Sequence, residues 1–164
     1  MQTTGAVQPR KLKIRFSDLG ARQWFWRNAP HRWGKRVELS FREVPFKQLE
    51  IAGSLRHFDV IERWQEQLAR GQAIPALVVS ATQHGTYYLH DGNHRYFAMR
   101  EHFGARVWDL PVRIAVLTPT AGYQWHFQWF GTYATWVLKP ARAWPEDYAR
   151  SRNPATLNLP QVSL

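Results

Sequence analysis

Cysteine is absent from this chain of 164 residues, so it can form no disulfide and offers neither a thiolate metal ligand nor a cysteine nucleophile. Long apolar runs are absent too, since no stretch approaches the roughly 20 apolar residues of a membrane-spanning helix. The first residues lack the apolar segment of a secretory signal peptide. We therefore expect a cytoplasmic protein with no membrane partner.

Acidic residues are few. The chain has 12 aspartates and glutamates against 22 lysines and arginines, a net charge of +10, which favours polyanionic partners or substrates. Most of the excess lies before Val37, where Asp18 is the single acidic residue. Six basic side chains of this region are candidates for contact with the phosphates of a nucleic acid: Arg10, Lys11, Lys13, Arg15, Arg22 and Arg27.

Aromatic residues, by contrast, are plentiful: nine Trp, nine Phe and six Tyr supply bulky material for one core. We predict an α/β (α+β) domain with a small mixed sheet at residues 37–140, preceded by a basic aromatic extension (1–36) and followed by a tail (141–164). In the extension, aromatic residues interleave with arginines between residues 17 and 35. Two interpretations remain open: a platform that stacks on bases while guanidinium groups meet phosphates, or a flap packed on the domain with snorkelling arginines.

Hydrophobic periodicity predicts the elements of the domain. Alternation at period two predicts strands at 11–16 and 37–41, with strand propensity continuing over 44–49. A helix is expected from Ser54, as its N-cap, to Arg70, and a second helix from 93 to 103, each followed by a glycine. Further strands are expected at 76–79, 86–89, 112–117, 123–129 and 133–138, the first two joined by a turn at 83–85.

The densest group of chemically active side chains is the run Asp91-Gly92-Asn93-His94-Arg95, between a predicted strand and a predicted helix. Gly92 allows a sharp turn and Asn93 is a suitable N-cap. The first helical turn then presents unpaired N–H groups and a positive dipole end, which suit phosphate. Arg95 adds a bidentate donor, His94 a hydrogen bond or proton, and Asp91 a base or metal ligand. The alternative is that Asp91 and Asn93 only cap the turn while His94 and Arg95 are solvated.

This run and the elements around it resemble the ParB/sulfiredoxin superfamily. The similarity covers roughly residues 37–117, and its specific part is the DGxHRxxA pattern that residues 91–98 follow. The resemblance implies a small α/β fold in which the His-Arg motif binds nucleotide phosphates. It also implies phosphate-site roles for Asp91, Gly92, His94 and Arg95, with Asn93 at the variable position.

The chain departs from three branches of that superfamily. Sulfiredoxins carry a catalytic cysteine beside the His-Arg pair, where this chain has Asn93, so sulfiredoxin chemistry is excluded. Chromosome-partition proteins continue into a helical DNA-reading domain, and nothing after Leu117 has that pattern. A free-serine kinase branch places a catalytic glutamate between the first strand and first helix. Glu50 is the candidate there, although it is not in clear register, and Glu43 is the other glutamate that could serve. The alternative is that both are solvated surface groups.

We therefore expect a nucleotide-binding protein, with Mg²⁺-dependent phosphotransferase or phosphohydrolase activity. Asp91, His94 and Glu50 are the candidate catalytic residues. Gly92, Asn93, His94 and Arg95 are expected to bind a nucleoside di- or triphosphate or another phosphorylated small molecule, and Asp91 to hold Mg²⁺. The alternatives are a nucleic-acid-binding protein or nuclease that uses the basic N-terminal region, and a nucleotide-binding module without turnover.

Overall fold

The computed structural model describes residues 13–51, 57–131 and 133–141. Three α-helices occur in this part of the chain: α1 (Leu19–Arg32), α2 (Phe58–Ala69) and α3 (Asn93–Phe103), with two short 3₁₀ helices, η1 (Phe46–Gln48) and η2 (Gly104–Asp109). The strands are β1 (Phe16–Ser17), β2 (Val37–Pro45), β3 (Leu49–Glu50), β4 (Ile74–Pro75), β5 (Leu77–Ala81), β6 (Tyr87–Asp91), β7 (Pro111–Pro119), β8 (Tyr123–Phe130) and β9 (Tyr133–Pro140). None of these helices is long and apolar enough to cross a membrane.

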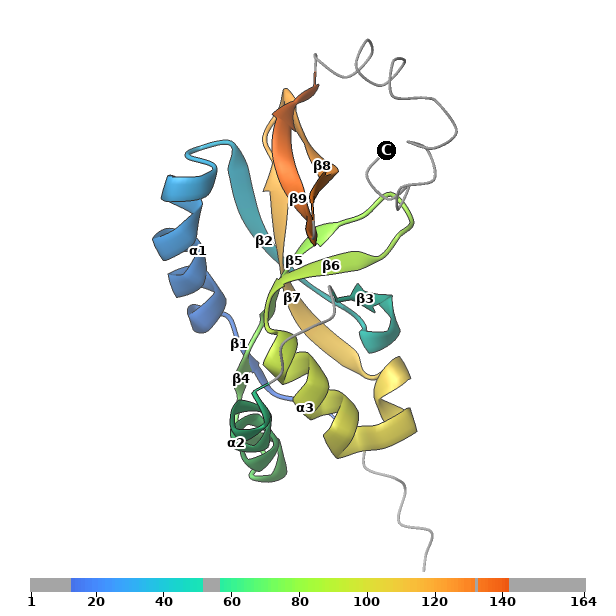
Figure 1. Cartoon of the computed structure of the whole chain (residues 1–164). Helices are drawn as coiled ribbons and strands as arrows, with labels where there is room; N and C mark the ends of the chain where they lie inside the picture. The colour runs from blue at the N-terminus through green and yellow to red at the C-terminus, as the bar shows by residue number, and fades with distance from the viewer. Residues whose placement is uncertain (1–12, 52–56, 132, 142–164) are drawn as a thin grey trace, which may run out of the picture.

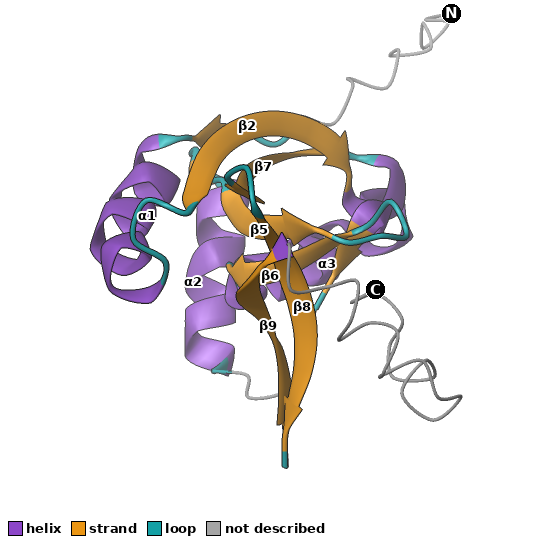
Figure 2. Ribbon diagram, turned by 90° about the horizontal axis from the view of Figure 1, so that it is seen from above, coloured by secondary structure: helices purple, strands orange, loops and turns teal. Residues whose placement is uncertain are grey.

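Five strands form the central sheet, in the order β2-β7-β5-β6-β3. Strand β5 runs parallel to β7 and antiparallel to β6, so the sheet is mixed and the predicted α/β class is confirmed. The long β2 pairs with β7 along its whole length and arches beside it (Figure 2). Two smaller sheets, β1-β4 and β8-β9, complete the fold.

The central sheet is covered on both faces. Leu77 and Val79 of β5 belong to a core shared with α2 and α3, whereas Val78 belongs to a second core shared with α1 and the β8–β9 hairpin. Because both faces are buried, β5 begins with three consecutive apolar residues, Leu77, Val78 and Val79, rather than alternating. Figure 1 shows α1 beside β2, with α2 and α3 grouped at the end of the molecule opposite the hairpin.

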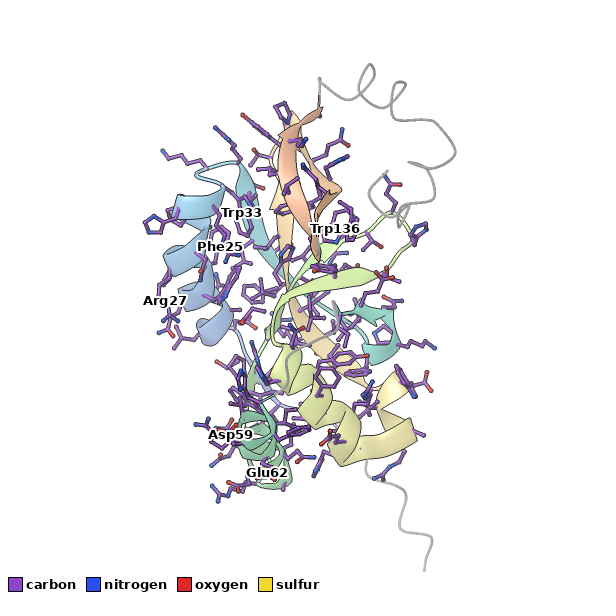
Figure 3. The ribbon with its side chains drawn as sticks, viewed as in Figure 1. Phe25, Arg27, Trp33, Asp59, Glu62 and Trp136 are labelled. Atoms are coloured by element: carbon purple, nitrogen blue, oxygen red, sulfur yellow. The ribbon has the colours of Figure 1, made fainter. Side chains whose placement is uncertain are left out.

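Helix α1 packs on the domain as a flap. Ala21, Ala29 and Trp33 are buried in the second core, and in Figure 3 Phe25 and Trp33 lie on the sheet side of the helix while Arg27 points away. A Cβ on Gly20 would lie 2.8 Å from the Cβ of Pro75, so the missing side chain lets α1 approach β4 closely. Residues 17–35 thus pack on the domain as the flap interpretation expects, and contact of this segment with bases or phosphates stays a prediction.

Asp18, just before α1, forms a bidentate ion pair with Arg113 of β7. Arg113 Nε donates to Asp18 Oδ1 at 2.7 Å and Nη2 donates to Oδ2 at 2.8 Å. These hydrogen bonds hold the pKa of the Asp18 carboxyl below its ordinary value. The pair fastens the start of α1 to the central sheet.

Asp18→Asn should lower the free energy of unfolding by about 1 kcal/mol, because one half-buried bidentate pair is lost. Urea unfolding at pH 7 measures the change. The control is Asp59→Asn, which removes an exposed helical pair with Arg63 at 3.6 Å and should cost no more than about 0.5 kcal/mol. Equal losses in the two variants would contradict a fastening role for Asp18.

Several predicted boundaries move. Helix α2 begins at Phe58 with His57 as its N-cap, while Ser54 falls in the segment 52–56, outside the described residues. The expected strand at 11–16 is reduced to β1, and Arg10 and Lys11 also lie outside. Strand β2 includes the expected strand at 37–41 and only the first two residues of the segment 44–49, whose remainder forms η1 and the first residue of β3. Nearly all of the predicted tail, residues 142–164, is not described.

Candidate functional site

The turn between β6 and α3 requires a glycine. Gly92 has φ 114°, a conformation that side chains with a Cβ rarely adopt. A Cβ there would also lie 2.5 Å from Leu77 Cδ2 and 3.2 Å from Arg95 Nη2. Gly92 is the N-cap of α3, so the prediction of Asn93 as N-cap is wrong: Asn93 is the first helical residue, and its side chain caps nothing. The glycine brings the end of β6 against the first turn of α3.

Arg95 turns inward from that first turn and is 6 % exposed. Its Nη2 donates to Asp91 Oδ2 at 2.8 Å, and its Nη1 donates to the carbonyls of Pro75 (2.6 Å) and Ala76 (3.0 Å). Burial lowers the pKa of the guanidinium, and the neighbouring Asp91 carboxylate opposes that shift. Three of its five N–H donors are therefore engaged inside the protein. Arg95 ties α3 to the ends of β4 and β6.

Asp91 faces the surface at the same junction. Its side chain is 40 % exposed, and only Oδ2 is used by Arg95. Within the described residues, Oδ1 has no hydrogen-bond or ion-pair partner. Asp91 therefore offers one free carboxylate oxygen beside the first turn of α3.

His94 meets the start of a second helix. The backbone N–H of His57 donates to His94 Nε2 at 3.3 Å, and the two imidazole rings lie 5.5 Å apart. The bond needs a lone pair on Nε2, so it forms with neutral His94 carrying its proton on Nδ1. The contact places the N-termini of α2 and α3 side by side.

Within the described residues, N–H groups without a hydrogen-bond partner lie at the start of both helices, next to the contact between His57 and His94. Those of Asn93, His94 and Arg95 precede the first hydrogen bond of α3, from Tyr96 N–H to the Gly92 carbonyl at 2.8 Å. Helix α2 likewise begins with a bond from Val60 N–H to the His57 carbonyl at 3.0 Å. Each helix adds a positive dipole end, so the junction attracts anions.

Asn93 leaves an unmet hydrogen-bonding group at the same place. Its Oδ1 is buried and has no partner in the described chain. Buried polar atoms without a partner are rare in folded proteins and are common where a ligand or ordered water completes the bonding. The first residue of α3 therefore has an acceptor that no described residue of the chain engages.

Glu50 lies apart from these residues. It pairs in register with Tyr88 on β6, and its carboxylate accepts a hydrogen bond from Thr86 Oγ1 at 2.9 Å. At about 3.3 Å per strand residue, Tyr88 is about 10 Å along β6 from Asp91, and Thr86 is farther still. The structure brings Asp91, Gly92, Asn93, His94 and Arg95 together but does not bring the Glu50 carboxylate to them.

Other predicted groups lie elsewhere. Arg22 and Arg27 are on α1, against the opposite face of the sheet, and Arg15 Nη1 donates to the Gly71 carbonyl at 3.5 Å. His90, which precedes the motif in the sequence, is half-buried on that opposite face, where it bonds to Ser80 and packs against Trp33 and Trp125, so it shares no site with His94. Among the residues with described positions, no group of three histidines, aspartates or glutamates is placed to hold a metal ion by itself.

Sequence reasoning missed His57. The residue lies inside the stretch predicted as the first turns of a helix, so its position at the helix start was not anticipated. A histidine next to a helix start carries no pattern of its own in one sequence. Its partner, His94, is 37 residues away.

Comparison with known proteins identifies similarity to a solved structure and to no family model. No family model matches the chain, and no curated protein matches it. Among solved structures, it is similar to SbnI with C-terminal truncation from Staphylococcus aureus, with 21 % identity and a TM-score of 0.37. The match covers 53 % of this chain and 34 % of that chain.

Proposed function

We propose that this protein binds the phosphate groups of a nucleoside di- or triphosphate at the junction of α2 and α3. The observation that carries the proposal is the convergence of two helix N-termini, fixed by the bond from His57 N–H to His94 Nε2. Unpaired N–H groups and two positive dipole ends then point at the same place. The resemblance of residues 91–98 to the DGxHRxxA pattern supports the same ligand.

The roles of His94 and Arg95 differ in this proposal. Phosphate oxygens accept hydrogen bonds from the N–H groups of Asn93 and His94, and the imidazole of His94 adds a further donor. Arg95 acts on the phosphate indirectly. Its hydrogen bonds to Pro75, Ala76 and Asp91 fix the turn that presents those N–H groups. Arg95 is thus a positioning residue that also contributes positive charge.

The residues also fit a magnesium ion that arrives with the nucleotide. Mg²⁺ bound with substrate phosphates commonly takes only one or two protein carboxylates and keeps several waters. Asp91 Oδ1 is the free carboxylate oxygen beside the proposed phosphate position. Bound there, the ion would neutralise phosphate charge.

For phosphoryl transfer or hydrolysis, the site itself offers the Asp91 carboxylate as a proton acceptor. Both ring nitrogens of His94 are already in use, Nε2 as the acceptor from His57 N–H and Nδ1 as the donor to phosphate. Glu50 does not reach the site in this arrangement, since its carboxylate is held by Thr86. We therefore propose nucleotide binding as the function of this site. A nucleotide-hydrolysis assay on the same samples tests whether the protein also turns the nucleotide over.

Two variants that each introduce a negative charge test the proposal. His94→Glu puts a carboxylate at the N-terminus of α3, where the helix dipole stabilises it but where it repels phosphate. His102→Glu makes the same change at the exposed C-terminal end of the same helix. Thermal melts are recorded with ATP, ADP, CTP, GTP and pyrophosphate, each with and without Mg²⁺.

A nucleotide at about 100 times its dissociation constant should stabilise the wild type by about 2.7 kcal/mol. His102→Glu should behave in the same way, whereas His94→Glu should weaken binding by about 10- to 100-fold. If none of these compounds stabilises the wild type, or if His94→Glu keeps full affinity, the proposed phosphate site is wrong.

A further inference from the structure

A second electropositive region lies on the other face of the sheet. Between Gly20 and Arg36 the chain has five cations and no acidic residue: Arg22, Arg27, Arg32, Lys35 and Arg36, all of them exposed. Asp18, just before this stretch, is neutralised by Arg113. No carboxylate of the described chain lies within ion-pairing distance of any of the five. Their charge is therefore available to a polyanion.

Aromatic rings hold three of these guanidinium groups in place, Arg22 over Phe41 at 4.7 Å among them. Arg32 lies over the rings of Trp24 and Trp33, at 5.8 Å from each centroid, and Arg36 lies over the ring of Tyr123 at 5.3 Å. Stacking fixes the plane of a guanidinium while its in-plane N–H donors stay free for phosphate oxygens. We call residues 32–36, which end α1 and enter β2, the cationic turn.

The cationic turn borders a cavity of about 250 Å³ between the β8–β9 hairpin and the β5–β6 turn. Its walls combine aromatic rings with polar side chains: Thr82, Gln83, Tyr123, Gln124, Trp125 and Trp136. Tyr123 is shared, since it lines the cavity and also carries Arg36. We call this space the aromatic cavity.

Trp136 has an unmet hydrogen bond beside the aromatic cavity. It is 6 % exposed and lies where β9 meets Tyr88 of β6, with ring centroids 6.1 Å apart (Figure 3). Its indole Nε1 is buried and has no acceptor within the described residues. Buried indole N–H groups usually find a partner. The cavity wall thus holds a donor that no described residue engages.

We infer that the cationic turn and the aromatic cavity together bind single-stranded nucleic acid. Phosphates meet Arg32, Lys35 and Arg36, while one unstacked base enters the cavity against Tyr123. A base is flat and apolar on its faces and polar at its edge, and the cavity offers aromatic rings together with the side-chain amides of Gln83 and Gln124. The site is separate from the proposed phosphate site, which lies with the α2 and α3 core.

Two other polyanions fit less well. A base inside a duplex is paired and stacked, so it cannot enter the cavity without being flipped out. An anionic membrane favours a helix with segregated apolar and basic faces. On α1 the exposed Trp26, at 64 % exposure, lies among Arg22, Gln23 and Arg27, so the exposed side of the helix is mixed.

The test uses a dye-labelled 12-nucleotide single strand of mixed sequence, its duplex, and phosphatidylserine vesicles, each titrated with the full chain. Lys35→Glu/Arg36→Glu should weaken single-strand binding at least about tenfold and reduce the slope of log K against log salt by about 1.4, for two lost phosphate contacts. The control, Arg70→Glu/Arg106→Glu, makes the same charge change at exposed positions near α2 and η2. It should weaken binding less than about threefold.

Tyr123→Leu tests the cavity separately. Loss of one base–aromatic stack should weaken binding about tenfold and leave the salt slope unchanged, because no phosphate contact is removed. His94→Glu should bind the strand as tightly as the wild type does. A failure of the proposed phosphate site can therefore be distinguished from a failure of the nucleic-acid site. Equal weakening by the two double variants, an unchanged affinity in Tyr123→Leu, duplex binding as tight as single-strand binding, or binding to vesicles alone would each overturn the inference.

Discussion

Replacing Asp91 with alanine should lower the free energy of unfolding by about 3–5 kcal/mol, because it leaves the buried Arg95 guanidinium without its counter-ion. Arg95 keeps its bonds to the carbonyls of Pro75 and Ala76, but carbonyls do not neutralise its charge. Water cannot reach it well at 6 % exposure. The expected loss is therefore that of an uncompensated buried charge, measured by urea unfolding at pH 7.

Two further variants make this result interpretable. Asp109→Ala removes a carboxylate that pairs with Lys47 at 3.0 Å on the surface, and it should cost at most about 1 kcal/mol. Arg95→Met, combined with Asp91→Ala, removes both charges and should recover part of the loss. If Asp91→Ala costs no more than Asp109→Ala, the ion pair does not hold the turn and the positioning role of Arg95 is wrong.

Acid should destabilise the protein through His90. Burial, with a smaller contribution from the charge of Arg32, lowers the pKa of His90 to about 4. In the unfolded chain a histidine titrates near 6.5, so between these values the unfolded state binds the extra proton and the folded state does not. This contribution to stability is intact above about pH 6.5 and is lost as pH falls. The full loss is about 3 kcal/mol once pH is below both values.

The comparison variant is His90→Gln, whose amide can still bond Ser80, the residue that His90 Nε2 contacts at 2.8 Å. Carboxylates such as Asp18 also titrate in acid, so the informative quantity is the difference between the two proteins in urea unfolding from pH 7 to 4. We expect the wild type to lose about 3 kcal/mol more than His90→Gln. His84→Gln, at an exposed turn, should follow the wild type. Parallel curves for wild type and His90→Gln would show that His90 titrates normally.

Local patterns predicted much of the fold. The alternation at 123–129 and the apolar run at 76–79 became β8 and β5, and the helix expected at 93–103 is α3. These features depend on neighbours in the sequence. The contact of Gly20 with Pro75 joins segments 55 residues apart, and no periodicity encodes it.

The position of the candidate site in the sequence was predictable, but the orientation of its side chains was not. The run from Asp91 to Arg95 identified the strand–turn–helix junction, because glycine and capping residues have local conformational preferences. The direction of Arg95 was not predictable, since two of its acceptors are backbone carbonyls about 20 residues earlier in the chain, and any residue could supply them. The phosphate, nucleotide and metal roles themselves stay predictions.

Strand β5 lies between the two hydrophobic cores. Its side chains contribute alternately to the two cores, so a change at Val79 is felt among α2 and α3, while a change at Val78 is felt among α1 and the hairpin. The two faces of the central sheet can therefore change their side chains almost independently. Substitutions could alter what one face binds while the other face keeps its geometry.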